Sequence, residues 1–478
     1  MVTTFFVFSV ILGLAIYFTR NKTMNYALVI LHLALLTTLN IHEYAHQDKL
    51  EDRFFRADSL GFIFFVVLTI ISSTTLIHSY IYNEKRKESM RKIALHNVGF
   101  VGLITSIVGV LLSTHIGLMW AFIEATTLSV AVLIYHDRDR LSLEATWKYI
   151  FVASVGIALA FTGILFLGIA FQGAGNIDFT IDAIKQSAGQ LDPIWLKVSF
   201  LFVLTGFSVK MGIVPLFNVD IDAKDVSPSP IGAMFSSALL NVGFVAIFRF
   251  YECFAQTSIL EWMNKVLMIS GILSIFFATV YLLKVQNYKR AFAYSSMEHA
   301  GIAIIALATG GVGYFAAILH LVLHSFTKAS IFYQIGQIHR VYQSKHETHL
   351  GGYFKINPYG ATVMLLALFS VLAMPPFGMF ISEFLTFKAL ANKGHWFILM
   401  TMLVLLSFIV FSLTRKFLVL LFGEMPTHKK FSKNNGGIHP AETITQFILL
   451  GLVLYCGVVQ PDMLKTYIEG AVKLLAVK

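Results

Sequence analysis

The chain has 478 residues, of which 57% are hydrophobic and 13% are charged, and its formal net charge is +10. Soluble domains usually carry about 25% charged residues, so this composition excludes a soluble protein and predicts an integral membrane protein. The excess of Lys and Arg is interpreted as loop charge facing the cytoplasm and not as a nucleic-acid-binding surface.

Apolar runs of about 20 residues without strict two-residue alternation predict transmembrane helices and argue against a β-barrel. The first run lacks the basic leading region and cleavage site of a signal peptide, and Arg20 and Lys22 follow it. It is therefore predicted to be a helix whose N-terminus lies outside. The chain as a whole is predicted to be all-α, with about 14 spans, near 2–19, 24–42, 58–82, 95–112, 114–135, 147–171, 194–214, 228–251, 261–284, 298–310, 312–340, 357–391, 396–421 and 442–468.

Basic residues alternate between successive loops. Even-numbered loops contain few unpaired cations, such as Lys185 and Lys393. Odd-numbered loops are rich in them: Arg20, Lys22, Lys85, Arg86, Lys87, Arg91, Lys92, Arg138, Arg140, Lys284, Lys289, Arg290, Arg340, Lys345, Lys355, Lys429, Lys430 and Lys433. The positive-inside rule then predicts a multi-pass protein of the cell (inner) membrane with both termini on the non-cytoplasmic side.

Four ionisable residues lie inside the predicted spans: Glu124, Lys210, Lys328 and Glu383. A charge at a helix centre costs roughly 2.5–3.5 kcal/mol on insertion scales, so such residues usually mark ion paths or paired sites. The alternative is a structural ion pair that only fixes helix packing.

The predicted eleventh span, in HLVLHSFTKASIF, contains His320, His324 and Lys328 at intervals of four residues. Residues at this spacing lie on one face of a helix. The spacing therefore predicts a line of titratable side chains along one side of the span.

Two of the charged spans also carry helix-breaking prolines. Pro215 follows Lys210, and Pro375 and Pro376 precede Glu383. Broken helices at corresponding positions of two halves are a sequence sign of a transport site. Spans 7 and 12 are therefore predicted to be broken.

Lys210 and Glu383 are 173 residues apart, and two further pairs of titratable residues have nearly the same separation: Glu124 with Glu298, and Lys148 with His320. This offset predicts two inverted five-helix repeats. The predicted units are 1–94 (peripheral helices 1–3), 95–251 (first repeat, helices 4–8), 252–421 (second repeat, helices 9–13) and 422–478 (a cytoplasmic loop and helix 14). Glu298, His299 and Lys148 are treated as accessory candidates, because they are predicted near the ends of their spans, where charged side chains can reach water.

Other motifs point to no cofactor and no metal. HEYAH at 42–46 matches the H-E-x-x-H zinc signature, but it lies where a span runs into a charged loop, and no companion motif is present. Cys253 and Cys456 predict neither a disulfide framework nor a metal–thiolate site. With no P-loop, dinucleotide fingerprint or Fe–S cysteine cluster in the sequence, the chain is expected to be a non-catalytic, ion-translocating subunit.

These motifs resemble one family along essentially the whole chain: the antiporter-like subunits of respiratory complex I, of Mrp cation/proton antiporters and of group 4 hydrogenases. The segments that carry the resemblance are DAKDVSPSPIGAMFSSALLNVGFVAIFRF, YSSMEHAGI and HLVLHSFTKASIF, together with Glu124, Lys210 and Glu383. Within the family, WKY, SSMEHAGI, LHSFTKA and MPPFGMFISEF look most like hydrogenase-4 component F subunits of formate hydrogenlyase-type complexes.

The resemblance implies proton translocation through a buried Glu/Lys/His relay, driven by a redox module on partner subunits. Glu124 and Lys210 are expected to form a switchable pair, and Glu383 to exchange protons with the far side. Many relatives have a lysine in helix 8 where this chain has Asn241, so the central relay is expected to use His320, His324 and Lys328 instead.

The expected partners are other membrane subunits and a peripheral hydrogenase or dehydrogenase arm. Two alternatives stay open at this point. One is an Mrp-type Na⁺/H⁺ antiporter subunit. The other is a non-conducting scaffold or the membrane partner of an anion-uptake complex.

Overall fold

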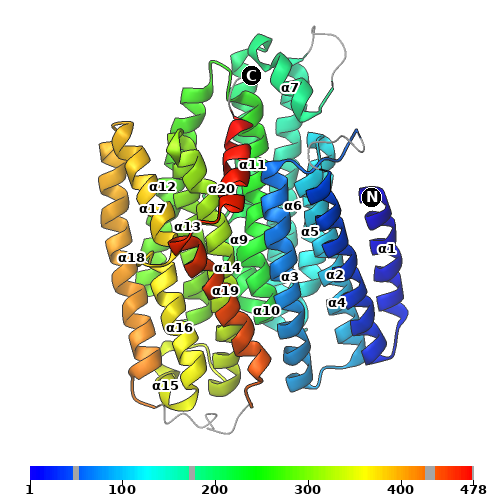
Figure 1. Ribbon diagram of the computed structural model, residues 1–478, viewed down its shortest axis with the longest axis vertical. Coiled ribbons are helices and arrows are strands. Elements are labelled where there is room, and N and C mark those ends of the chain that lie inside the picture. The colour runs from blue at the N-terminus through cyan, green and yellow to red at the C-terminus, as the bar shows by residue number, and fades with distance from the viewer. Residues whose placement is uncertain (47–52, 172–177, 426–436, 476–478) are drawn as a thin grey trace.

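Long helices packed side by side make up the computed structural model, which describes residues 1–46, 53–171, 178–425 and 437–475 (Figure 1). In these ranges the extended structure is limited to isolated bridges, such as the one between Phe55 and Ser113. Twelve described helices are long and apolar enough to cross a membrane, or thirteen if one bent pair counts as a single span. The all-helical membrane fold is confirmed.

The N-terminal part of the chain forms six long helices. Their bounds are α1 Val2–Phe18, α2 Lys22–Ala45, α3 Ser59–Arg86, α4 Met90–Leu112, α5 Ile116–Ile134 and α6 Arg140–Ala170. α1 has 17 residues, slightly fewer than a typical span. It corresponds to the first predicted span.

The next part contains the first broken span. Its elements are α7 Ile181–Ser187, η1 Ala188–Gln190, α8 Pro193–Met211, α9 Asn218–Val226, α10 Ser229–Met234, η2 Phe235–Leu239 and α11 Leu240–Phe254. η2 is a short π-helical segment that joins α10 to α11 in one continuous span. α8 ends one residue after Lys210, and the chain leaves the helix through residues 212–217.

The remaining elements form the other half of the molecule. They are α12 Leu260–Lys284, α13 Tyr288–Thr309, α14 Val312–Tyr342, η3 Glu347–His349, α15 Tyr353–Ile356, α16 Pro358–Val371, α17 Gly378–Asn392, α18 Trp396–Phe422, α19 Pro440–Val458 and α20 Asp462–Lys473. α16 and α17 are the two parts of the predicted twelfth span, separated by residues 372–377, which contain both prolines. Both predicted breaks are therefore present.

Several predicted boundaries differ from the structure, and two spans differ most. The tenth span begins at Tyr288 and not at 298, because Asn287 caps the helix and its first turns are polar but buried. Hydropathy alone cannot detect such turns as part of a span. The last predicted span, 442–468, is two helices, since α19 ends at Val458 and Pro461 separates it from the amphipathic α20.

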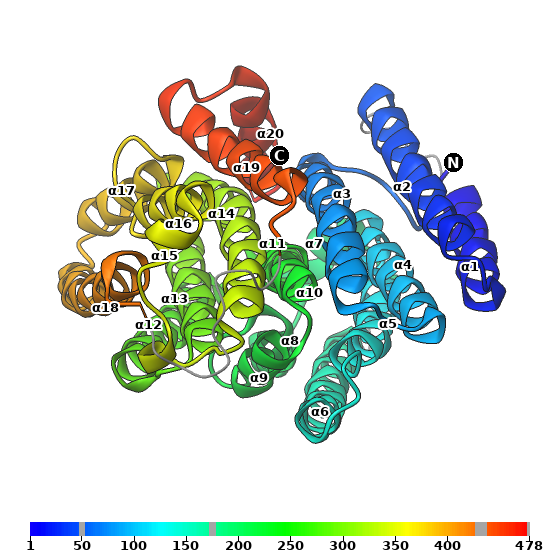
Figure 2. The same ribbon diagram turned by 90° about the horizontal axis from the view of Figure 1, so that it is seen from below.

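The centre of the layer is formed by α10–α11, α13 and α14. The apolar windows of α10–α11 and α13 are completely buried, and α14 is almost completely buried. Seen from below in Figure 2, α1 and α2 lie at one edge and α18 at the opposite edge. Polar side chains on the central helices are therefore shielded from lipid.

Two glycines set the geometry of the first break. Gly212 ends α8 with φ +73°, a left-handed conformation that favours glycine. Gly243 on α11 lies against the end of α8 so closely that a Cβ would come 2.4 Å from the Met211 nitrogen. The break is thus packed directly against the central helix.

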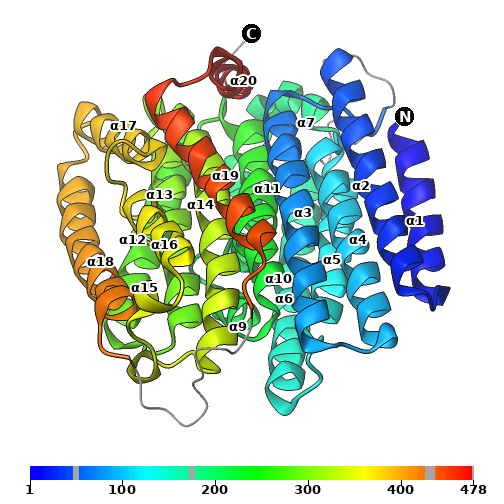
Figure 3. The same ribbon diagram turned by 60° about the horizontal axis from the view of Figure 1, so that its bottom comes forward.

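The two ends of the chain lie on the same side of the layer (Figure 3). The described odd-numbered loops lie on the other side, where α6 and α13 begin. Which side faces the cytoplasm stays a prediction. Three residues of the predicted basic loops, Lys429, Lys430 and Lys433, lie outside the described residues.

Candidate functional site

Lys210 lies in the first break, on the last turn of α8, with 1% of its surface exposed. Its ammonium group donates hydrogen bonds to Thr127 Oγ1 at 2.7 Å and to the Tyr149 hydroxyl at 3.2 Å. It also lies 5.3 Å from the centre of the Tyr149 ring. Three helices, α5, α6 and α8, therefore hold this cation.

Glu124 is joined to Lys210 through a hydroxyl group. Thr127 Oγ1 donates to Glu124 Oε2 at 3.3 Å while accepting from Lys210, and Ser154 Oγ donates to Glu124 Oε1 at 3.2 Å. No direct ion pair of the expected kind joins the two residues, because Thr127 lies one turn along α5 and occupies the space between them. The expected pair is instead a carboxylate–hydroxyl–ammonium bridge.

A buried ion pair follows the break on α9. Lys224 Nζ is 2.5 Å from Asp220 Oδ2, and both side chains are almost fully buried. Lys210 interacts electrostatically with Asp220, and Lys224 does so with both His324 and Lys328. The Asp220–Lys224 pair therefore lies between the two halves of the molecule.

Sequence reasoning missed this pair. The available signal was an aspartate and a lysine at i and i+4, directly after the proline of a broken span. Such a pair is common on exposed helix faces. Here it is buried because α9 packs into the protein beside α13 and α6.

Asn241 lies at the start of α11 beside α14. Its Nδ2 donates to Ser325 Oγ at 2.9 Å, and its Oδ1 is buried without a hydrogen-bond partner in the described structure. Ser325 directly follows His324 in the chain. Asn241 thus lies beside the row of His320, His324 and Lys328 on α14, as a hydrogen-bonding group that does not titrate.

The predicted line on α14 is present. His320, His324 and Lys328 are all fully buried. Lys328 Nζ donates to the backbone oxygen of Phe292 at 3.4 Å and interacts electrostatically with Glu298. Lys328 is therefore a fully buried cation of the second half, with Glu298 on α13 as its counter-charge.

Glu298 and His299 lie inside the layer and not at its edge, since α13 begins earlier than expected. His299 Nδ1 is 3.2 Å from His320 Nε2 and 3.9 Å from Glu383 Oε1. Glu383 in turn interacts electrostatically with Glu298. This group connects the α14 line to the carboxylate of the second break.

Lys148 lies apart from these residues. Its side chain is 53% exposed, and its ammonium group pairs with Glu144 at 2.6 Å. The accessory position expected for Lys148 by analogy with His320 is therefore at the surface. It lines a polar cavity of about 710 Å³.

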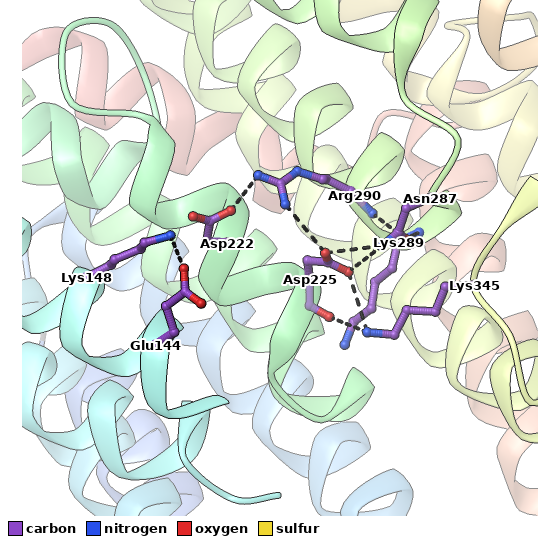
Figure 4. Close-up of polar contacts among 8 residues, drawn as sticks. All are labelled: Glu144, Lys148, Asp222, Asp225, Asn287, Lys289, Arg290 and Lys345. Atoms are coloured by element: carbon purple, nitrogen blue, oxygen red, sulfur yellow. Dashed lines mark hydrogen bonds and ion pairs between the residues drawn. The ribbon is translucent and has the colours of Figure 1, made fainter. Parts of the chain in front are cut away.

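This cavity opens on the side of the odd-numbered loops, and Figure 4 shows the charges in and beside it. Asp225 accepts hydrogen bonds from Asn287 at 3.0 Å and from Lys345 at 3.5 Å, and Arg290 pairs with Asp222 at 2.5 Å. At the rim, the backbone N–H of Ser142 holds the pKa of Asp139 below its usual value. The cavity is a water-accessible, charged vestibule.

Lys289 lies beside the vestibule, between Asn287 and Arg290 in the chain, which both line it. Only 3% of it is exposed, and its ammonium group donates to the backbone oxygen of Ser227, at the end of α9. The vestibule thus ends against the helix that carries the Asp220–Lys224 pair.

The HEYAH motif lies at the end of α2. The rings of His42 and His46 stack with centroids 4.3 Å apart, and His42 Nδ1 is 3.6 Å from Glu43 Oε1. Their ligand atoms do not converge on a common point in the described part of the chain. A convergent set of possible ligands lies elsewhere, at His299, His320 and Glu383.

Comparison with known proteins connects this geometry to a family. The model of the family described as NADH:quinone oxidoreductase/Mrp antiporter, TM, matches residues 113–410, more than half of the chain. A hydrogenase-4 component F homolog of Methylacidiphilum infernorum is 33% identical over 344 residues, covering 70% of this chain and 72% of that protein.

Solved structures share the fold. An archaeal membrane-bound sulfane sulfur reductase complex contains a chain with a TM-score of 0.87 and 18% identity, covering 99% of this chain and 97% of that one. The Mrp complex of a Dietzia species contains one with a TM-score of 0.82 and 17% identity, over the same shares of the two chains. The family match, the helix breaks and the buried residues agree, and the chain therefore belongs to the antiporter-like transmembrane subunits of the NADH:quinone oxidoreductase/Mrp family.

Proposed function

We propose that this chain moves protons across the cell membrane as a subunit of a redox-driven complex. The observation that carries the proposal is a series of charged and imidazole side chains between the two helix breaks, all of them buried except Glu124, which is half-buried. In order, its members are Glu124, Lys210, Asp220, Lys224, His324, Lys328, Glu298, His299, His320 and Glu383.

Two steps of this series pair a buried cation with a carboxylate, Lys224 with Asp220 and Lys328 with Glu298, whereas Lys224 and Lys328 repel each other. A buried ammonium needs a nearby carboxylate, and a buried carboxylate needs a cation or a proton. If Lys210 loses its proton, Asp220 interacts more strongly with Lys224, and the interaction between Lys224 and Lys328 changes in turn. Proton movement at one end is thus transmitted to the other end electrostatically.

Thr127 gives the first step a direction. Its single hydroxyl hydrogen points to Glu124 while its oxygen accepts from Lys210. A proton can pass from the ammonium to the carboxylate only if this hydroxyl shifts its own proton in the same step. The bridge therefore couples the protonation of Glu124 to that of Lys210.

The vestibule is the proposed access from the cytoplasm. A volume of about 710 Å³ holds many water molecules, each needing about 30 Å³. The basic loops on this side support cytoplasmic placement, with both termini on the non-cytoplasmic side. Other membrane subunits and a peripheral hydrogenase or dehydrogenase arm are the proposed partners. The two inverted repeats, helices 4–8 and 9–13 in the predicted numbering, are part of this proposal.

The test is proton uptake by the intact complex in liposomes, with Lys210 replaced. Lys210→Ala should abolish uptake while assembly and the electron-transfer reaction persist. Lys210→Arg should fail too, because arginine does not release its proton in proteins. Lys197→Ala on the same helix is the matched control and should pump normally.

Unchanged uptake in an assembled Lys210→Ala complex would contradict the proposal. Repeating the measurement with and without Na⁺ separates it from the Na⁺/H⁺ antiporter. A strict Na⁺ requirement would favour that alternative. A complex that never moves protons would favour the scaffold or the anion-uptake partner.

A further inference from the structure

Two imidazoles and one carboxylate converge beside the second helix break. We propose that His299, His320 and Glu383 form a binding site for a divalent transition-metal ion. We further propose that the bound ion blocks proton transfer along the series of side chains described under the proposed function. Binding is independent of the proposed function, whereas the effect on proton movement rests on it.

The ligand atoms already have suitable separations. His299 Nδ1 is 3.2 Å from His320 Nε2 and 3.9 Å from Glu383 Oε1, and one ligand atom from each residue lies within 4.8 Å of the others. Ligands at 2.0–2.1 Å from a tetrahedral Zn²⁺ lie about 3.3 Å from one another. Side-chain shifts of about 1 Å would therefore bring three ligand atoms to the separations of a tetrahedral zinc site.

The surroundings hold one of the ligands in place. His320 Nδ1 is 3.0 Å from Ser382 Oγ, next to Glu383 in the chain. The second ring nitrogen of His299, Nε2, is buried and has no hydrogen-bond partner in the described structure, so only His320 is held in this way. Metal-binding histidines usually use their second ring nitrogen in this way, which fixes the tautomer and the ring orientation.

A fourth group lies beside the three ligands. The His324 ring is 5.1 Å from that of His299, is fully buried, and has no hydrogen-bond partner on either nitrogen in the described structure. An unpaired buried imidazole is costly, and coordination would satisfy one of its nitrogens. His324 would become a fourth ligand only if its ring moved toward the site, because its nitrogens lie outside the group of ligand atoms within 4.8 Å of one another.

The local charges partly compensate a divalent ion. Glu298 interacts with Glu383, so two carboxylates lie near the site, while Lys328 interacts unfavourably with a positive charge at His299. Hard cations such as Mg²⁺ prefer oxygen ligands, whereas imidazole suits zinc, copper and nickel. The donor set therefore favours an ion such as Zn²⁺.

Of the two ligands Glu383 and His299, Glu383 is the more exposed. Its side chain is 11% exposed, whereas His299 is fully buried. A bound ion would occupy the imidazole nitrogens and the carboxylate that carry the proton in the proposed line. Proton transfer between His320 and Glu383 would then stop.

The test adds Zn²⁺ alone to the purified intact complex. Zn²⁺ bound per complex is measured by competition with a chelating dye, and its ligands by X-ray absorption at the zinc edge, as the difference between the complex with and without added Zn²⁺. We expect one additional ion with two or three imidazole ligands. Glu383→Gln and His320→Gln should weaken binding roughly 100-fold, and Ser382→Ala about 10-fold, as for an outer-shell partner.

A double variant, His42→Gln with His46→Gln, is the control for zinc at the HEYAH motif. It should leave the X-ray absorption difference unchanged. The proposed site would be refuted if the unmutated complex and the Glu383→Gln complex bound Zn²⁺ equally. It would also be refuted if Zn²⁺ in the unmutated complex had no imidazole ligands. Because the second measurement uses the unmutated complex, it holds even if a variant fails to assemble.

Proton uptake separates this inference from the proposed function. If Zn²⁺ binds as expected but uptake in the unmutated complex is unaffected, the site stands and the proton line through it is wrong. If Glu383→Gln stops uptake but binds Zn²⁺ normally, the proton line stands and the metal site is wrong.

Discussion

The two helix breaks place opposite charges in different chemical surroundings. Lys210 precedes its break and is held by the hydroxyl groups of Thr127 and Tyr149. Glu383 follows its break and faces imidazoles, with His299 at 3.9 Å. A hydroxyl bridge has one proton and a defined direction, whereas an imidazole can donate from one nitrogen and accept at the other. In the proposed proton series, the first break therefore passes a proton through a hydroxyl, and the second passes it through imidazoles.

Between the breaks lies a direct ion pair, Asp220–Lys224, of a kind that neither break has. It responds to both sides, since Asp220 interacts with Lys210 and Lys224 with Lys328. In the proposed function, the two ends then define local proton positions and the middle transmits charge. The following predictions test this division, from the largest expected effect to the smallest.

The central pair should show the largest effect on stability. Asp220→Ala leaves Lys224 buried without its counter-charge, a change that typically costs about 3–5 kcal/mol. The double variant Asp220→Leu with Lys224→Met should be markedly more stable than Asp220→Ala. Thermal unfolding of the complex measures both. A double variant as unstable as the single one would show that the pair is not the relevant interaction.

Close packing at the first break should come next. In Gly243→Ala the new Cβ would meet the backbone of Met211 at 2.4 Å, so one of the two helices must move. Overpacking of this kind costs about 1–3 kcal/mol. Gly451→Ala on α19, where a Cβ meets nothing within 4 Å, is the matched control. Equal melting temperatures for the two variants would contradict the close approach.

The hydroxyl bridge should separate stability from function. Thr127→Val keeps the shape of the side chain but leaves Lys210 and Glu124 each without one hydrogen bond, at a cost of about 1–3 kcal/mol. Proton uptake should fall to background, whereas Thr127→Ser should restore it. Normal uptake in Thr127→Val would show that the two charges do not communicate through this residue.

Lys148 should show the smallest effect. Because its pair with Glu144 is exposed, Lys148→Met should change neither the melting temperature nor proton uptake measurably. A strong loss of uptake would restore Lys148 as an accessory residue of the line. It would also place the start of the line in the vestibule.

The sequence by itself determined the class of fold and much of the line. Long apolar runs predict spans because a bilayer admits backbone only when its hydrogen bonds are internal. Prolines beside Lys210 and Glu383 predict both breaks, because proline lacks the N–H that a helix interior needs. The four-residue spacing of His320, His324 and Lys328 predicts one helix face. All of these signals are local in the chain.

Only the tertiary structure decided which charges meet. Thr127 between Glu124 and Lys210, and the burial of Asp220 and Lys224, depend on contacts between helices distant in sequence. The same holds for Glu298 and His299, which hydropathy places at an edge but which lie inside the layer. The physical reason is that the cost of a charge depends on the helices that surround it, and hydropathy and periodicity describe only its neighbours along the chain.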